Sequence, residues 1–210
     1  MIKSYRSEYP NQVHQLTVSV SKHYYVTKTG VLKYRKKKQE ISLDRLADSE
    51  RVHMIHYVIR DHFSGLFYAE LGLSNNIIPV QRFLYGAWAE EKDYSFYGIP
   101  ESLTIPSTVT AVFPELARQV TGLGIQPIKV TSGFQGGVRD INTIERYLTI
   151  SLIFPFKQPQ LEIKEIWESV NRQKSRNGRD TKMDLWRENV KIVTIPPDQW
   201  PDNFRGGGEV

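Results

Sequence analysis

Apolar and polar residues alternate over residues 12–20. Period-two alternation of this kind predicts a β-strand. Residues 51–60 are rich in Val, Ile and Tyr, which is typical of a strand that is buried on at least one face. The turn-forming residues within 61–65 follow directly, so the pattern predicts a hairpin whose second strand runs over 66–73.

Helical spacing of apolar residues begins after the predicted hairpin, over residues 78–92. The remaining predicted elements are a strand at 102–105, a helix at 112–123, a strand at 126–130, and helices at 140–153, 161–174 and 181–189. Three strands followed by strand–helix alternation favour an α/β fold with a five-stranded mixed sheet flanked by helices. We expect a core domain at 1–155, a C-terminal helical extension at 156–190 and an irregular tail at 191–210.

Composition narrows the class of protein. The 210 residues are 40% hydrophobic and 24% charged, which are values typical of globular proteins. Cys is absent, so disulfides, thiol nucleophiles and Cys-ligated zinc are excluded. No apolar run approaches the roughly 18 residues of a membrane span. The first residues lack the apolar core of a signal peptide, so we expect a cytoplasmic protein without a membrane partner.

Basic residues are clustered, although the net charge is only +5. Five of the six residues at 33–38 are cations, and residues 171–179 hold four more. Such clusters attract a phosphate backbone without reading its sequence. The alternative interpretation is a solvated hairpin surface and a charged loop at a helix end.

Five short motifs resemble, in the same order, those of the retroviral integrase and transposase core family, which has a ribonuclease H-like fold. The resemblance covers about residues 10–155. The motifs are PNQVHQLT at 10–17, IRDHFSG at 59–65, GIPE at 98–101, LGI at 123–125 and GGVRDINTIE at 136–145.

The resemblance implies a site of two aspartates and one glutamate that hold two divalent ions, usually Mg²⁺, for phosphoryl transfer. At the matching positions this chain has Thr17 for the first aspartate and Pro106 or Ser107 for the second. Only the glutamate has a match, at Glu145. The site therefore loses two negative charges, and we expect two-metal binding to be severely weakened.

Other polar residues offer alternatives to this site. Asp61 is expected to cap the turn of the hairpin. Asp140 lies five residues before Glu145, about 140° around a helix, so the two carboxylates are not expected to share a face. Histidines at 53, 56 and 62 are interpreted as interior or turn residues, because the first two point to opposite faces of a strand.

The leading hypothesis is a catalytically degenerate integrase-like domain that binds nucleic acid, with DNA favoured, or a recombination-protein partner. No cofactor is expected. The candidate nucleic-acid-binding residues are Lys33, Arg35, Lys36, Lys37, Lys38, Arg139 and Arg146. The first alternative is an active nuclease or transposase that uses Mg²⁺ or Mn²⁺ with carboxylates from other positions. The second is a structural or homo-oligomeric protein with no nucleic-acid role.

Overall fold

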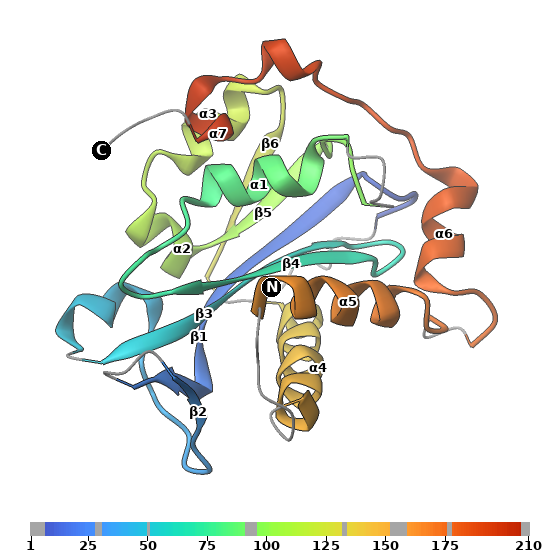
Figure 1. Cartoon of the computed structure of the whole chain (residues 1–210). Helices are drawn as coiled ribbons and strands as arrows, with labels where there is room; N and C mark the ends of the chain where they lie inside the picture. Colours follow the sequence, from blue (N-terminus) through green and yellow to red (C-terminus); the bar gives the residue numbers. More distant parts are fainter. Residues whose placement is uncertain are drawn as a thin grey trace.

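The computed structural model of the chain describes residues 7–27, 31–49, 51–90, 96–131, 134–151, 159–175 and 178–206. One mixed sheet forms its centre, with the strand order β4–β3–β1–β5–β6, and β2 pairs with the far end of β1 (Figure 1). The strands are β1 Val13–Val26, β2 Leu32–Tyr34, β3 Val52–Asp61, β4 Phe67–Leu73, β5 Ser102–Pro106 and β6 Gln126–Val130. The predicted five-stranded mixed sheet is confirmed, and β2 extends it to six strands.

Helices surround this sheet. They are α1 Val80–Trp88, α2 Ser107–Val112, α3 Leu116–Gly122, α4 Gln135–Ser151, α5 Pro159–Asn171, α6 Lys182–Asn189 and α7 Asp202–Arg205, with 3-10 helices η1 Leu43–Asp48 and η2 Pro197–Gln199. In Figure 1, α1 lies above β3 and β4, whereas α4 and α5 lie below them. No helix among the described residues is long and apolar enough to cross a bilayer.

Antiparallel pairing of β1 with β3 sorts side chains onto two faces, with Leu16 opposite Ile59 and Thr17 opposite Val58. The face of Leu16 is packed by α1, whose predicted apolar positions are all buried: Val80, Phe83, Leu84, Ala87 and Trp88. The face of Thr17 meets α4 and carries several buried polar groups. The alternation of β1 therefore separates an apolar core from a polar layer.

Two helices differ from the sequence predictions. The predicted helix at 112–123 begins only at Leu116, as α3, and Val112 is instead the last residue of a separate helix, α2. The segment between the two helices contains Pro114, and proline disrupts helical hydrogen bonding. Helix α4 begins at Gln135, five residues earlier than predicted. The glycines at 136 and 137 suggested a loop, but they are buried inside the first turn of α4.

The segment predicted as an irregular tail contains η2 and α7 instead. Trp200 and Phe204 are buried, and the Trp200 ring packs edge-on against Tyr85 of α1 at a centroid distance of 5.1 Å. These apolar contacts order the segment on the outer side of α1. In the predicted helical extension, Trp167 and Trp186 are buried in the core. The predicted boundary at 155/156 lies outside the described residues.

Candidate functional site

The fold brings together the two positions at which the family aspartates were predicted. β1 and β5 pair in parallel, from Val13 opposite Ser102 to Gln15 opposite Thr104. Thr17 on β1 and Pro106, the last residue of β5, each lie two residues beyond the last paired position. Thr17 is buried, and its hydroxyl has no hydrogen-bond partner among the described residues. The neighbouring Ser107 begins α2, and its hydroxyl donates to the carbonyl of Thr131 at 3.1 Å.

The residue of α4 that contacts Thr17 is a glycine. A Cβ built on Gly137 would overlap the Thr17 hydroxyl and would lie 3.0 Å from the Thr17 Cβ. This close approach leaves no room for a longer side chain at position 137. Thr17, Pro106 and the residue that contacts Thr17 from α4, Gly137, are all uncharged.

Glu145 lies elsewhere on α4, over a later part of β1. Its carboxylate accepts hydrogen bonds from the Ser21 hydroxyl at 2.6 Å and from His56 Nε2 at 3.0 Å. Ser21 is four residues beyond Thr17, which corresponds to about 13 Å along a strand. Burial acts to raise the pKa of Glu145, but His56 and Ser21 outweigh it, so the pKa lies below its ordinary value. The structure thus does not bring Glu145 to Thr17.

The other nearby carboxylates have partners of their own. Both oxygens of Asp140 accept from Arg60 Nη1, at 2.8 and 2.7 Å. Asp61 caps the hairpin turn, as predicted, by accepting from the backbone N–H groups of Asn11 and Ser64 and from the Ser64 hydroxyl. Burial raises the pKa of Asp61 to about 6, although these hydrogen bonds act to lower it.

The histidines are separated in the same way. His53 contacts the Ser49 hydroxyl, His56 contacts Glu145, and His62 contacts Ser7. Buried His14 accepts from Trp88 Nε1 at 3.0 Å, and burial lowers its pKa to about 3, so it is a neutral core residue. These four partners lie at different places in the fold.

A pair of magnesium ions does not fit the residues at Thr17. Mg²⁺ and Mn²⁺ favour charged oxygen ligands, whereas this place offers one neutral hydroxyl, a proline ring and a glycine. Within the described part of the chain, no three His, Asp or Glu side chains gather closely enough to hold a metal ion. We therefore derive no metal-dependent step at this site.

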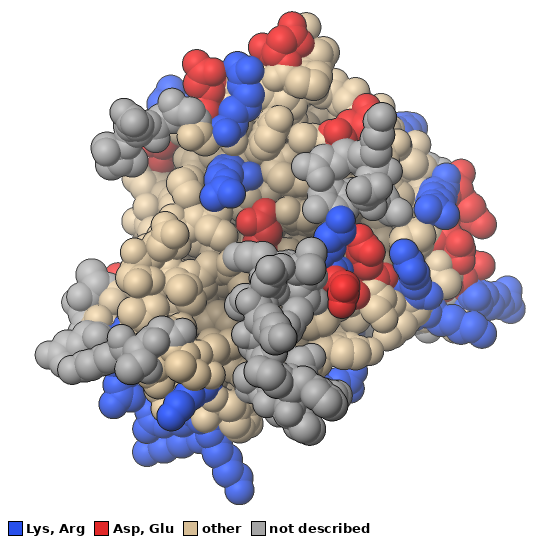
Figure 2. Space-filling model, viewed as in Figure 1, with Lys and Arg blue, Asp and Glu red and all other residues tan. Residues whose placement is uncertain are grey.

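The predicted basic cluster is fully exposed. It comprises Lys33, Arg35, Lys36, Lys37 and Lys38, in β2 and the segment that follows it. Figure 2 shows Lys and Arg side chains gathered at the lower left of the molecule, where Figure 1 shows β2. Tyr34 lies within the cluster, is 46% exposed and stacks on His23 at a centroid distance of 5.4 Å. An exposed ring among cations can stack on a nucleobase, and it also serves the cross-strand packing of the hairpin.

Arg139 and Arg146 are exposed on α4 and line a cavity of about 730 Å³. Sequence reasoning missed two other residues of this cavity, Arg60 and Lys182. The sequence gives little indication of either residue. One is a single cation in a buried strand, the other is a single cation at the start of a helix, and neither belongs to a recognisable motif. The cavity is formed only by tertiary contacts between β3, α4 and α6.

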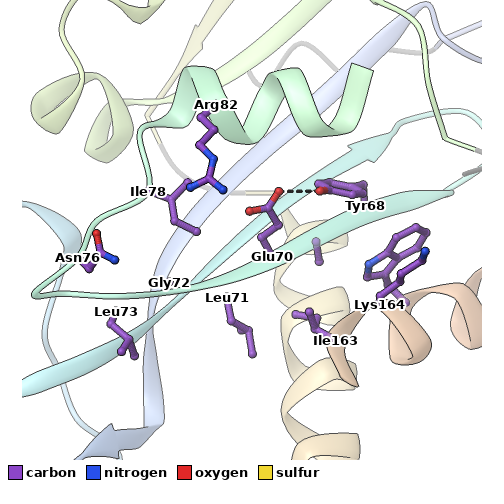
Figure 3. A pocket seen from close by; sticks show the side chains of 12 residues that line it. Tyr68, Glu70, Leu71, Gly72, Leu73, Asn76, Ile78, Arg82, Ile163 and Lys164 are labelled. Carbon is purple, nitrogen blue, oxygen red and sulfur yellow. Dashed lines mark hydrogen bonds between the residues drawn. The ribbon is translucent and has the colours of Figure 1, made fainter. Parts of the chain in front are cut away.

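A second cavity of about 580 Å³ lies at β4, the outermost strand of the sheet, between α1 and α5. Figure 3 shows Glu70 and Arg82 approaching each other across it, with the Tyr68 hydroxyl donating to Glu70. That hydrogen bond measures 2.6 Å. Burial raises the pKa of Glu70, while Tyr68 and Arg82 oppose the shift.

The strand order, with three antiparallel strands followed by two parallel ones and α4 across β1 and β3, defines a ribonuclease H-like fold of the integrase catalytic-core type. Solved structures agree with this class. The HTLV-2 integrase catalytic core domain, in complex with magnesium in a trimeric form, has a TM-score of 0.55 and 16% identity, over 87% of this chain and 100% of that chain. The BIV integrase catalytic core domain has a TM-score of 0.50 and 11% identity, over 85% of this chain and 95% of that chain.

A chain of the simian T-cell lymphotropic virus intasome, solved with the PP2A regulatory subunit B56 gamma, has a TM-score of 0.57 and 14% identity. That match covers 91% of this chain and 61% of the viral chain. No family model matches the sequence, and no curated protein matches it either. The chain thus shares the fold of retroviral integrase cores at very low sequence identity.

Proposed function

We propose that this chain is an integrase-like domain that binds nucleic acid, most favourably DNA, and that lacks the two-metal chemistry expected of its fold. The observation that carries the proposal is that Thr17 and Pro106, the positions that match the family aspartates, are uncharged, and that Thr17 is contacted from α4 by a glycine, Gly137. Two-metal phosphoryl transfer needs negatively charged ligands for the ions that stabilise the attacking and leaving oxygens.

The rival enzyme hypothesis requires carboxylates from elsewhere. In this chain, Glu145 is engaged by Ser21 and His56, and Asp140 is engaged by Arg60. Freeing either carboxylate for a metal would leave a buried partner unsatisfied, at a cost of about 1–3 kcal/mol. An active site would therefore need carboxylates from another chain. We propose that Glu145 is a structural residue.

Support for binding comes from the exposed basic cluster at 33–38. Within the described part of the chain, its side chains form no ion pair with an acidic residue, so they remain available to phosphates. Phosphate contacts of this kind give affinity that is sequence-independent and falls steeply with salt. A recombination-protein partner or a second copy of this chain would use an interaction that is much less sensitive to charge.

The test is DNA affinity in EDTA, measured by fluorescence anisotropy over a range of salt concentrations. Replacing the three lysines at 36–38 with Ala should weaken binding and reduce the slope of log K against log salt by up to about 3. The matched control removes three exposed cations elsewhere, at Arg118, Lys129 and Arg187. We expect the control to retain most of the affinity.

Equal losses in the two triple variants would contradict a localised surface and indicate a response to net charge alone. No measurable DNA or RNA binding in the unmodified protein, together with a defined oligomer by light scattering, would favour the structural alternative. Nicking of DNA that depends on Mg²⁺ or Mn²⁺ would favour the enzyme.

A further inference from the structure

The cavity between β3, α4 and α6 has an unusual charge balance. Among the described residues, its lining carries five cations and one carboxylate: Arg60, Arg139, Arg146, Lys174, Lys182 and Asp140. Like charges in a partly desolvated space repel one another more strongly than they would in bulk water. The lining therefore favours an anion inside the cavity.

Arg60 is built firmly into this cavity. Its side chain is 15% exposed, and Nη1 donates to both oxygens of Asp140. Glycines at 65 and 136 flank the guanidinium, and a Cβ on Gly136 would lie 3.1 Å from Arg60 Nε. The absence of side chains at these two positions leaves the guanidinium room to lie against the cavity.

Lys182 is the second cation at the inner wall. Thr181 and Asp184 form a capping box that fixes the start of α6, so the position of Lys182 is well defined. Its ammonium lies 5.0 Å from the centroid of the Phe67 ring, and within the described residues it has no hydrogen bond or ion pair. Burial lowers the pKa of Lys182 to about 8, although Asp140 opposes the shift. Asp140 thus pairs directly with Arg60 and offsets the charge of Lys182 only in part.

We infer that this cavity is an anion site that binds the phosphate group of a nucleotide between Lys182 and Arg60. Its volume of about 730 Å³ suits a ligand of nucleotide size. Phe63 and Phe134 also line the cavity, and Phe63 is 39% exposed, so an aromatic surface is present for a base. The inference goes beyond the proposed DNA surface at 33–38, because no residue of that cluster lines the cavity, whereas the candidate residues Arg139 and Arg146 do.

The experiment is calorimetric titration of the full chain with dAMP, deoxyadenosine and sulfate. We expect dAMP to bind about tenfold or more tightly than deoxyadenosine, because only dAMP carries the anion. Lys182→Met should weaken dAMP and sulfate binding by about tenfold, whereas the exposed-site control Lys129→Met should not. If Lys182→Met does not fold, Arg146→Gln, on the exposed side of α4, provides the second variant.

Charged and titratable groups face Lys182 from β3, the hairpin turn, α4 and the segment after α5. They are Arg60, His62, Arg139, Asp140, Arg146 and Lys174. Sulfate keeps its charge across neutral and basic pH, so its affinity should fall as the pH rises through about 8 and Lys182 loses its proton. Lys182→Met should lose this pH dependence.

Equal affinity for dAMP and deoxyadenosine, or no binding of either at millimolar concentration, would overturn the inference. Unchanged dAMP binding by Lys182→Met would also overturn it. A 5′-phosphorylated oligonucleotide that displaces dAMP, while its 5′-hydroxyl form does not, would identify a strand end as the source of the phosphate. If neither form of the oligonucleotide displaces dAMP, the source of the phosphate is a free nucleotide. Lys182→Met leaves the 33–38 cluster intact, so this result is separable from the DNA test.

Discussion

At the residue scale, Gly137 determines how closely α4 approaches β1. It is buried, and a Cβ there would overlap the Thr17 hydroxyl. A carboxylate side chain could be added at this position only if the helix moved away from the strand. The uncharged character of this place is therefore tied to the packing of the polar layer.

Gly137→Ala should lower the free energy of unfolding by about 1–3 kcal/mol, because it overpacks a close contact. Thr17→Ala removes part of that contact, so the double variant should lose less stability than the sum of the two single variants. Gly122→Ala is the matched control: nothing lies within 4 Å of its Cβ position, and it should leave stability unchanged or raise it. Denaturant unfolding measures the unmodified protein and the four variants. Strict additivity of the changes in unfolding free energy at positions 17 and 137 would contradict the contact.

Glu145 gives the second prediction at this scale. Glu145→Gln should lower the free energy of unfolding by roughly 1.5–3 kcal/mol, because Ser21 and His56 lose a charged acceptor. Glu115→Gln, which alters an exposed carboxylate, should change stability by less than about 0.5 kcal/mol.

The pH dependence of Glu145 follows from the depressed pKa of its carboxyl in the folded state. The stabilisation that it contributes is fully present above the ordinary pKa of 4.5 and is lost as the pH falls through the lower, folded-state pKa. Glu145→Gln should lack this acid-dependent loss in urea unfolding measured between neutral pH and acid. If Glu145→Gln keeps the pH profile of stability of the unmodified protein but loses a metal-dependent activity, Glu145 is catalytic.

At the element scale, the strands could be predicted from sequence because their alternation and turn residues are local signals. The hairpin of β3 and β4 and the helix α1 follow such signals closely. The start of α4 could not be predicted in the same way, because consecutive glycines normally favour a loop. Here they are helical since α4 must pass close to Thr17 and Arg60, which is a tertiary requirement.

The five-residue shift in the start of α4 matters for the candidate site. A helix that begins at 140 directs different residues toward β1 than one that begins at 135. With the observed start, Gly137 contacts Thr17, and Asp140 and Glu145 contact Arg60 and His56 along β3. Both carboxylates thus contact β3, although we expected that they would not share a face of the helix. Their partners, Arg60 and His56, lie four residues apart along the strand.

At the scale of the whole molecule, the order of the elements was sufficient to predict the mixed sheet and its layers. The cavity lined by Arg60 and Lys182 could not be predicted, because its residues are more than 100 positions apart along the sequence. Likewise, the packing of Trp200 on Tyr85 depends on a return of the chain to α1. The basic cluster at 33–38 was predictable, since consecutive cations are seldom buried.

The central claim is that the integrase-type fold here lacks a two-metal site. Calorimetric titration of the purified chain with MgCl₂ and MnCl₂ tests it most directly. We predict no stoichiometric binding of either ion, and identical traces for the unmodified protein, Glu145→Gln and Asp140→Asn. Specific binding of two ions that is abolished by either substitution would contradict the account and would restore the enzyme hypothesis.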